Sequence, residues 1–249
     1  MRFIKNPEKP VITTMIKSKT TDTILAEIGR ALEAGTDAFG WQVEGLPAEM
    51  KKPDLFKKMF DAMGDKPCYV TNYRRSNSEK LSDERIAEQM IQLAECGAVL
   101  IDVHGDIFCE TKYELTYDSR AVERQMALIR ELHRRGAEVL MSSHVLEFRS
   151  LEETLAISRA HYERGADISK IVTEANSEAE LNENFDITFA LKREIPIPTL
   201  FLCNGSHCRR HRLFGPTLGS CMYLCVEDNT PDKSSQPKLS IAKQIVGMY

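Results

Sequence analysis

The chain has 249 residues, of which 42% are hydrophobic and 28% charged, a composition typical of a globular protein. Its 33 Lys and Arg against 37 Asp and Glu give a net charge of −4, without the basic excess expected of a protein that binds nucleic acid or an anionic membrane. Because the chain has no apolar run of membrane-spanning length and MRFIKNPEKP lacks the apolar core of a signal peptide, we expect a cytoplasmic protein.

Apolar runs typical of buried strands alternate with amphipathic helical segments along the whole chain. In chain order, the predicted strand and helix pairs are 11–16 and 21–35, 38–44 and 53–63, 68–74 and 83–97, 99–104 and 120–135, 138–144 and 150–165, 168–175 and 177–194. A strand at 198–204 is followed by a predicted loop that carries HCRRHRLFG, and a strand at 221–227 by a helix at 240–249. We expect Asp22 to cap the first helix and Gly35 to end it.

Eight strands at a spacing of about 30 residues, each followed by a connection long enough for a helix, predict an α/β fold: a parallel, eight-stranded (β/α)8 TIM barrel. The strands are apolar runs rather than alternations, as a sheet buried on both faces requires. No GxGxxG follows the first strand, which argues against a dinucleotide-binding fold. We expect residues 1–249 to form one barrel domain.

Reactive groups of such a barrel gather at the carboxyl ends of the strands. The polar residues predicted there are Gln42, Glu44, Arg74, Arg75, Asp102, His104, Asp106, His144, Lys170, Glu174, Arg209, Arg210, Arg212, Ser234, Ser235 and Lys238. This set predicts a site for a small, anionic, hydroxylated molecule.

Two titratable residues lie in apolar strands that do not need them for packing. Lys170, within ISKIV, either reaches solvent or occupies a pocket that favours the uncharged amine. A desolvated amine near His144 would provide the nucleophile and the acid/base group that Schiff-base chemistry on a ketone requires. Period-two alternation places Glu174 on the face of Lys170, where it serves either the chemistry or the cap of the next helix.

The seven cysteines include no CxxC pair, so free thiols are expected. The cluster Cys203, His207, Cys208 and His211 does not match the spacing of a zinc site, and a loop whose His and Arg side chains face an anion explains it better. We therefore expect no metal and no cofactor.

Four segments, taken as an ordered series, resemble type I 3-dehydroquinate dehydratase: SSH at 142–144, ADISKI at 166–171, HRLFGPTLGS at 211–220 and SSQPKLSI at 234–241. The intervals between them match as well, so the resemblance covers nearly the whole chain. It implies a class I aldolase-type barrel and a lyase of the shikimate pathway of aromatic amino acid biosynthesis, often a homodimer.

The resemblance also implies roles for individual residues. Lys170 matches the imine-forming lysine, and His144 matches the general acid/base. Arg212 matches the arginine that grips the substrate carboxylate. Arg74, or Arg75 one residue later, matches a second arginine of the site. Ser234 matches a serine of the closing loop.

The sequence departs from the family pattern at several positions. Gly40 and Gln42 replace an acid and an arginine that contact the substrate, and Lys238 replaces a glutamine of the closing loop. His104 replaces the acid that orients the catalytic histidine, so His144 should lose its preferred tautomer and its basicity unless Asp102, Asp106 or Glu174 substitutes.

Three hypotheses follow. The first is a 3-dehydroquinate dehydratase, or a relative that dehydrates or cleaves another hydroxy-keto acid. The second is a metal-dependent barrel enzyme with ligands Glu44, His104, His144 and Glu174. The third is a non-catalytic relative that binds a shikimate-type ligand.

Overall fold

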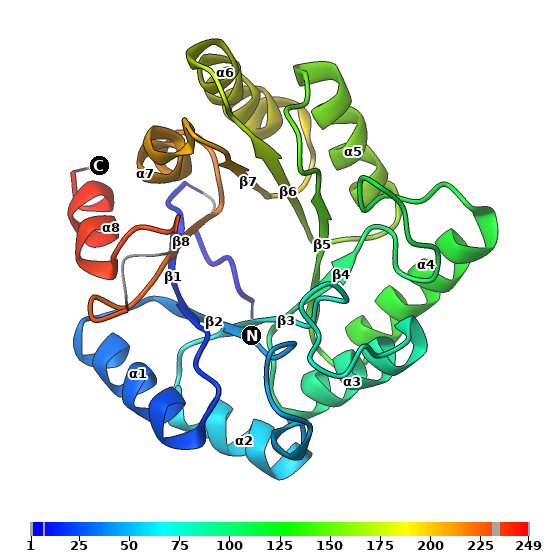
Figure 1. The fold of residues 1–249 in the computed structure, drawn as a ribbon, viewed down its shortest axis with the longest axis vertical. Coiled ribbons are helices and arrows are strands. Elements are labelled where there is room, and N and C mark those ends of the chain that lie inside the picture. The colour runs from blue at the N-terminus through cyan, green and yellow to red at the C-terminus, as the bar shows by residue number, and fades with distance from the viewer. Residues whose placement is uncertain (1, 7, 231–234, 249) are drawn as a thin grey trace.

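The computed structural model describes residues 2–6, 8–230 and 235–248. Figure 1 shows a ring of strands surrounded by helices, which confirms the predicted (β/α)8 barrel. The strands are β1 (Val11–Ile16), β2 (Ala38–Gln42), β3 (Cys68–Thr71), β4 (Leu100–His104), β5 (Glu138–His144), β6 (Ile168–Glu174), β7 (Thr199–Asn204) and β8 (Met222–Cys225). The α-helices are α1 (Thr21–Glu33), α2 (Pro53–Ala62), α3 (Asp83–Cys96), α4 (Ser119–Arg134), α5 (Leu151–Glu163), α6 (Glu178–Glu194), α7 (Cys208–Leu218) and α8 (Leu239–Val246), and a 3-10 turn covers Ala48–Met50.

Parallel ladders join the strands in the order β7–β6–β5–β4–β3–β2–β1–β8. Between the two end strands, the N–H of Cys221 donates to the carbonyl of Thr199 at 2.8 Å, so the sheet nearly closes. All eight strands therefore point their carboxyl ends to the same mouth of the barrel.

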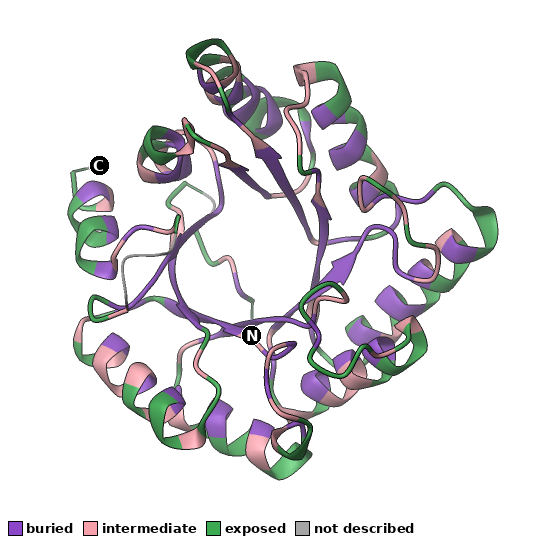
Figure 2. Ribbon diagram, in the orientation of Figure 1, coloured by how far each residue is buried: buried purple, intermediate pink, exposed green. Residues whose placement is uncertain are grey.

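The strands are buried on both faces, and so they carry two apolar layers (Figure 2). One layer fills the barrel interior and includes Met15, Leu140 and Leu200. The other packs the strands against the helices, where the ring of Trp41 meets those of Phe56 and Phe60 edge-on, each at 5.7 Å between centroids. Period-two alternation assigns each strand residue to one of these layers.

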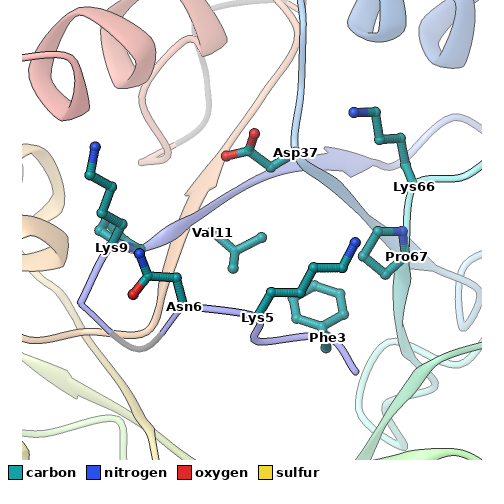
Figure 3. A pocket seen from close by; sticks show the side chains of 9 residues that line it. Phe3, Lys5, Asn6, Lys9, Val11, Asp37, Lys66 and Pro67 are labelled. Atoms are coloured by element: carbon teal, nitrogen blue, oxygen red, sulfur yellow. The ribbon is translucent and has the colours of Figure 1, made fainter. Parts of the chain in front are cut away.

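The amino-terminal end of the barrel is covered by the first residues of the chain. Phe3 is 1% exposed, and its N–H donates to the Glu138 carboxylate at 2.6 Å. Beside it lies a pocket of about 300 Å³ that Lys5, Lys9 and Lys66 help to line (Figure 3). This pocket is at the opposite end from the mouth where the predicted site residues lie.

The predicted cap of α1 is wrong: Thr20, not Asp22, accepts the N–H of Thr23. Asp22 lies within the first turn, where its charge favours the helix dipole.

The segment HCRRHRLFG, expected to be a loop, forms most of α7. His211 anchors one face of this helix, because its Nε2 pairs with the Thr188 hydroxyl at 2.9 Å and its ring meets Phe201 edge-on at 5.4 Å. Gly215 permits this packing, since a Cβ there would lie 2.9 Å from the His211 ring. Tertiary burial of one face therefore outweighs the weak local helix signal.

None of the helices within the described residues is both long and apolar enough to span a bilayer.

Candidate active site

Lys170 and His144 are brought together by the neighbouring strands β6 and β5, where Ser142 is in register with Lys170 and His144 with Val172. The flanking residues Ile168 and Val172 belong to the interior layer, so Lys170 points into the barrel, and it is only 4% exposed. Of the two alternatives for Lys170, solvent or a buried pocket, the structure shows the buried one. The cost of burying the amine must be offset by polar partners.

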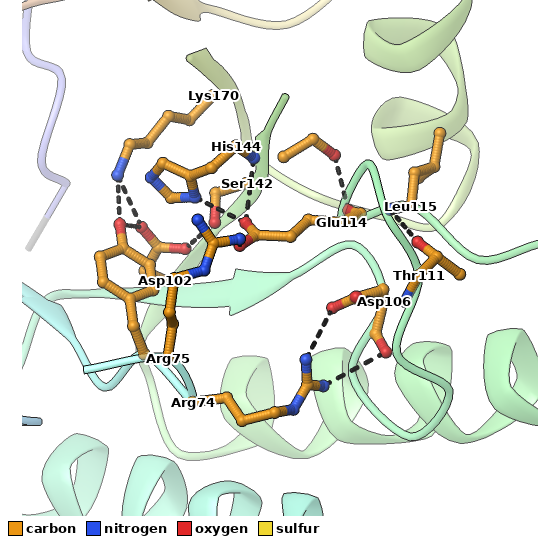
Figure 4. A network of polar contacts seen from close by, with 12 residues as sticks. Arg74, Arg75, Asp102, Asp106, Thr111, Glu114, Leu115, Ser142, His144 and Lys170 are labelled. Atoms are coloured by element: carbon orange, nitrogen blue, oxygen red, sulfur yellow. Dashed lines mark hydrogen bonds and ion pairs between the residues drawn. The ribbon is translucent and has the colours of Figure 1, made fainter. Parts of the chain in front are cut away.

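Three oxygen atoms contact the Lys170 amine, and Figure 4 shows this amine directed toward Asp102. Nζ lies 3.1 Å from Oδ2 of Asp102 and donates to the hydroxyl of Tyr69 at 2.9 Å. It also donates to the hydroxyl of Tyr73. Lys170 is therefore desolvated but ion-paired with a fully buried carboxylate, a contact that neither sequence alternative included.

Asp102 is the centre of this cluster. Burial by itself raises the pKa of its carboxyl, but the charges of Lys170 and the two nearby histidines, together with a hydrogen bond from Ser142 at 2.5 Å, outweigh it and lower the pKa to about 2. Burial and the Asp102 charge raise the pKa values of Tyr69 and Tyr73 well above their ordinary range. The cluster therefore holds an ionised carboxylate and two neutral phenols, each of which donates to Asp102.

His144 is oriented by Glu114, a residue of the loop between β4 and α4. Oε2 of Glu114 lies 2.6 Å from the ring Nδ1 and accepts the backbone N–H of His144 at 2.9 Å. Burial alone raises the pKa of the Glu114 carboxyl, but the hydrogen bond and charge of His144 lower it to about 2. An ionised carboxylate only accepts hydrogen bonds, so Nδ1 carries a proton and Nε2 faces the site.

None of the three acids named as possible substitutes orients His144, because each makes other contacts. Asp102 binds Lys170, and Asp106 accepts the N–H of Thr111 at 2.8 Å. Glu174, at the end of β6, accepts from the amide of Asn176 at 2.8 Å rather than from His144.

The loop that carries Glu114 is held by buried hydrogen bonds. Arg164, 5% exposed, donates to the carbonyls of Gly105 at 2.8 Å and Thr116 at 2.5 Å. The hydroxyl of Ser143 donates to the Glu114 carbonyl at 2.8 Å. Glu114 itself has a φ of 48°, a left-handed conformation that a non-glycine residue keeps only where its surroundings enforce it.

His104 packs against the site but is not hydrogen-bonded to His144. Its ring stacks on that of Tyr73 with 5.1 Å between centroids, and its Nε2 has no hydrogen-bond partner among the described residues. Burial lowers the pKa of this imidazole to about 4, so it is neutral at pH 7. His104 therefore supports the Tyr73 ring by packing against it as a neutral side chain.

The two candidate arginines after β3 point in different directions. Arg74 donates to Asp83 at 2.8 Å and to Asp106 at 3.4 Å, and Figure 4 shows it directed away from Lys170. Arg75 instead pairs with Glu114 at 2.8 Å, beside His144, and its side chain is 54% exposed. Arg75 is therefore better placed than Arg74 to meet an anion at the mouth.

Arg212 lies in α7 with its guanidinium turned toward the end of β7. It donates to the carbonyl of Cys203 and to the side chain of Asn204, each at 2.6 Å, and no carboxylate of the described residues pairs with it. Burial lowers the pKa of this guanidinium, as expected of a cation that has lost water without gaining an anion. Arg212 and Lys238 both line a pocket of about 400 Å³.

Gln42 and Lys238 also lie at this end of the barrel. Gln42 ends β2 and is half-buried. Lys238 donates to the carbonyl of Thr230 and is the N-cap residue of α8. At position 40, a Cβ would lie 2.2 Å from Sδ of Met15, so the methionine fills the space beside Gly40. Ser234 is outside the described residues.

The residues of the metal hypothesis are not assembled into a site. Glu44 accepts from the Thr71 hydroxyl at 2.9 Å, while His144 binds Glu114 and Glu174 binds Asn176. In residues 2–6, 8–230 and 235–248, no group of three His, Cys, Asp or Glu side chains is arranged to hold a metal ion.

Sequence reasoning missed Tyr69, Tyr73 and Glu114. The period-two pattern of CYVTNY placed Tyr69 and Tyr73 on one strand face, and extending the strand to Arg74 already included both. Glu114 gave no comparable signal, because it reaches His144 from a loop 30 residues away.

Comparisons with known proteins agree on one family. The model of type I 3-dehydroquinase matches residues 12–249. A 3-dehydroquinate dehydratase of Aromatoleum aromaticum is 23% identical over 235 residues, 90% of this chain and 85% of that protein. A 3-dehydroquinate dehydratase of Geobacillus thermodenitrificans is 24% identical over 230 residues, 88% and 83% of the two chains.

Solved structures share the same fold. A type I 3-dehydroquinate dehydratase of Clostridium difficile superposes with a TM-score of 0.80 at 16% identity, over 96% of this chain and 92% of that one. The Enterococcus faecalis structure of 3-dehydroquinate dehydratase gives a TM-score of 0.78 at 18% identity, over 97% and 94%.

Proposed function

The chain belongs to the type I 3-dehydroquinase family, and we propose that it is a carbon–oxygen lyase that dehydrates 3-dehydroquinate or a closely related hydroxy-keto acid through a Schiff base on Lys170. The observation that carries the proposal is a buried lysine amine in the barrel interior, beside an imidazole whose Nδ1 is fixed by a carboxylate. We further propose, from the family resemblance, that it acts in the shikimate pathway as a cytoplasmic homodimer.

Lys170 supplies the nucleophile. Its nitrogen attacks the ketone carbon, and loss of the carbonyl oxygen as water leaves an iminium that withdraws electrons from the neighbouring carbon. The buried Asp102 carboxylate, 3.1 Å from Nζ, stabilises the positive charge before and after this step.

His144 moves the proton. With Nδ1 held by Glu114, Nε2 takes the proton from the carbon next to the iminium, and an enamine forms. The same nitrogen then returns the proton to the β-hydroxyl group, which leaves as water. Hydrolysis of the conjugated iminium releases the product and restores Lys170.

The cations at the mouth select an anionic substrate. We assign the carboxylate to Arg212, whose guanidinium is buried without a carboxylate partner, and a second contact to Arg75. Lys238, Gln42 and Ser234 remain candidates for further polar contacts. Met15 fills the space beside Gly40, where the family has an acid, which supports a substrate whose hydroxyl pattern differs from that of 3-dehydroquinate.

The test is borohydride trapping with 3-dehydroquinate and a panel of related hydroxy-keto acids. Reduction of the Schiff base should add the mass of the reduced ligand to the peptide that contains Lys170, and Lys170→Met should abolish the adduct. Lys192→Met, which changes an exposed lysine of α6, is the matched control and should leave trapping unchanged. A wild-type protein that binds one of these acids yet is never modified at Lys170 contradicts the proposal.

A further inference from the structure

Tyr73 lies between the nucleophile and the imidazole of the proposed site. Its hydroxyl accepts a hydrogen bond from Lys170 Nζ and donates one to Asp102 at 2.6 Å. Its ring meets that of His144 edge-on with 4.8 Å between centroids. A molecule bonded to Nζ and facing His144 must therefore contact Tyr73.

We propose that Tyr73 is a catalytic residue that carries protons from the Lys170 nitrogen to the substrate carbonyl oxygen while the Schiff base forms. The proposal rests on the proposed Schiff-base function and adds to it the group that performs the first half of the reaction.

The proton balance of imine formation fits this relay. An ammonium with three protons and a ketone become an iminium with one N–H, so two protons must move from nitrogen to oxygen to release water. In each transfer, the phenol oxygen takes a proton from Nζ as its own O–H proton passes to the substrate oxygen. The C–N bond forms in the first transfer, and the C–O bond breaks in the second. Tyr73 is a neutral phenol before and after each transfer.

The geometry of the pair favours this role. In the addition intermediate, oxygen and nitrogen are bonded to the same carbon, so a hydroxyl that contacts Nζ also reaches that oxygen. To donate there, the Tyr73 hydroxyl turns away from Asp102, which keeps its hydrogen bonds from Ser142 and Tyr69. Stacking on His104 holds the Tyr73 ring in place during this rotation.

Other groups near the amine are less suited to this transfer. Tyr69 also contacts Nζ, but it is 0% exposed within β3, below the mouth. Tyr73 is half-buried and lies two residues beyond the end of β3, at the level where substrate enters. Asp102, with a pKa lowered to about 2, carries no proton to give at pH 7.

The experiment measures how fast the adduct at Lys170 forms. Wild-type protein is mixed rapidly with the acid of the panel that gives the most adduct at Lys170, quenched into borohydride at set times and analysed by mass spectrometry, in H₂O and in D₂O. Tyr73→Phe should slow adduct formation by roughly 10²–10³-fold, the range of a lost proton-transfer catalyst, and should remove the solvent isotope effect. Tyr223→Phe is the matched control: it deletes a phenol that donates to the Leu213 carbonyl, and it should leave the rate unchanged.

The outcomes separate the two proposals. Equal rates for wild type and Tyr73→Phe overturn the relay and leave the Schiff base intact, whereas a wild type that forms no adduct with any acid of the panel overturns both. Because Tyr73→Phe could also disturb folding, the wild type provides an independent measurement in H₂O–D₂O mixtures. Transfer through the phenol moves two protons at once and should give a curved dependence on deuterium fraction, and a linear or absent dependence contradicts it.

Discussion

Oε2 of Glu114 contacts His144 at two points, the ring Nδ1 at 2.6 Å and the backbone N–H at 2.9 Å. Glu114 belongs to the loop between β4 and α4, whereas His144 ends β5. One carboxylate oxygen thereby fixes the tautomer, the ring orientation and the strand end of the proposed base. The chemistry expected of His144 depends on this contact.

Replacement of Glu114 by Gln should therefore lower kcat by about 100-fold, in the range of a lost general base, with a smaller effect on KM. The amide offers either an N–H or a carbonyl to Nδ1 and no longer enforces one tautomer. Steady-state rates with 3-dehydroquinate provide the measurement. Glu110→Gln, in the same loop and exposed, is the matched control and should retain wild-type rates. Equal losses in the two variants would point to loop disruption instead.

Acid should destabilise the protein through Asp102 and Glu114. Both folded-state pKa values are lowered to about 2, while unfolded Asp and Glu titrate near about 3.9 and 4.3. The stabilisation is thus fully present above about pH 4.5 and is lost as the pH falls toward about 2, and each group contributes roughly 3 kcal/mol to the free energy of unfolding. Urea unfolding across this range measures it. Asp102→Asn should flatten the dependence, and an unchanged slope in that variant contradicts the assignment.

Replacement of Arg75 should weaken substrate binding, whereas replacement of Arg74 should lower the stability of the fold. Arg75→Leu should raise KM for an anionic substrate by about 10- to 100-fold, because a charged hydrogen bond contributes roughly 1.5–3 kcal/mol, while the midpoint of unfolding stays near that of wild type. Arg74→Leu removes the partner of the fully buried Asp106 and should lower the free energy of unfolding by roughly 1–3 kcal/mol. The assignment fails if Arg74→Leu has the larger effect on KM.

Gly40 and Met15 should be energetically coupled. A methyl group at position 40 would lie 2.2 Å from Sδ and 2.9 Å from Cε of Met15, so Gly40→Ala should cost roughly 1–3 kcal/mol through overpacking. Met15→Ala vacates that space, and the double variant should be at least about 1 kcal/mol more stable than the sum of the single effects. Urea midpoints of the four proteins give the coupling, and strict additivity would show that Met15 moves aside freely.

The sequence by itself determined the architecture and pointed to Lys170 as the proposed nucleophile. Eight apolar runs, about 30 residues apart, define buried parallel strands, because only residues that cover both faces of a sheet dispense with polar alternation. Period-two alternation put Lys170 on the same strand face as Val172 and Glu174, and the structure shows that this is the interior face of β6. The order of the strands also identified the mouth at which the site residues gather.

Only the tertiary structure decided which polar groups contact Lys170 and His144. The ion pair of Lys170 with Asp102 joins residues 68 positions apart, and the hydrogen bond of His144 with Glu114 spans 30. Such contacts depend on strand register and on the path of a loop, neither of which local sequence encodes. Contacts between distant segments also decide that α7 is a helix, because His211 packs in a buried site against β7 and α6. The physical reason is that local sequence decides which faces are buried, while packing between distant segments decides which polar groups meet there.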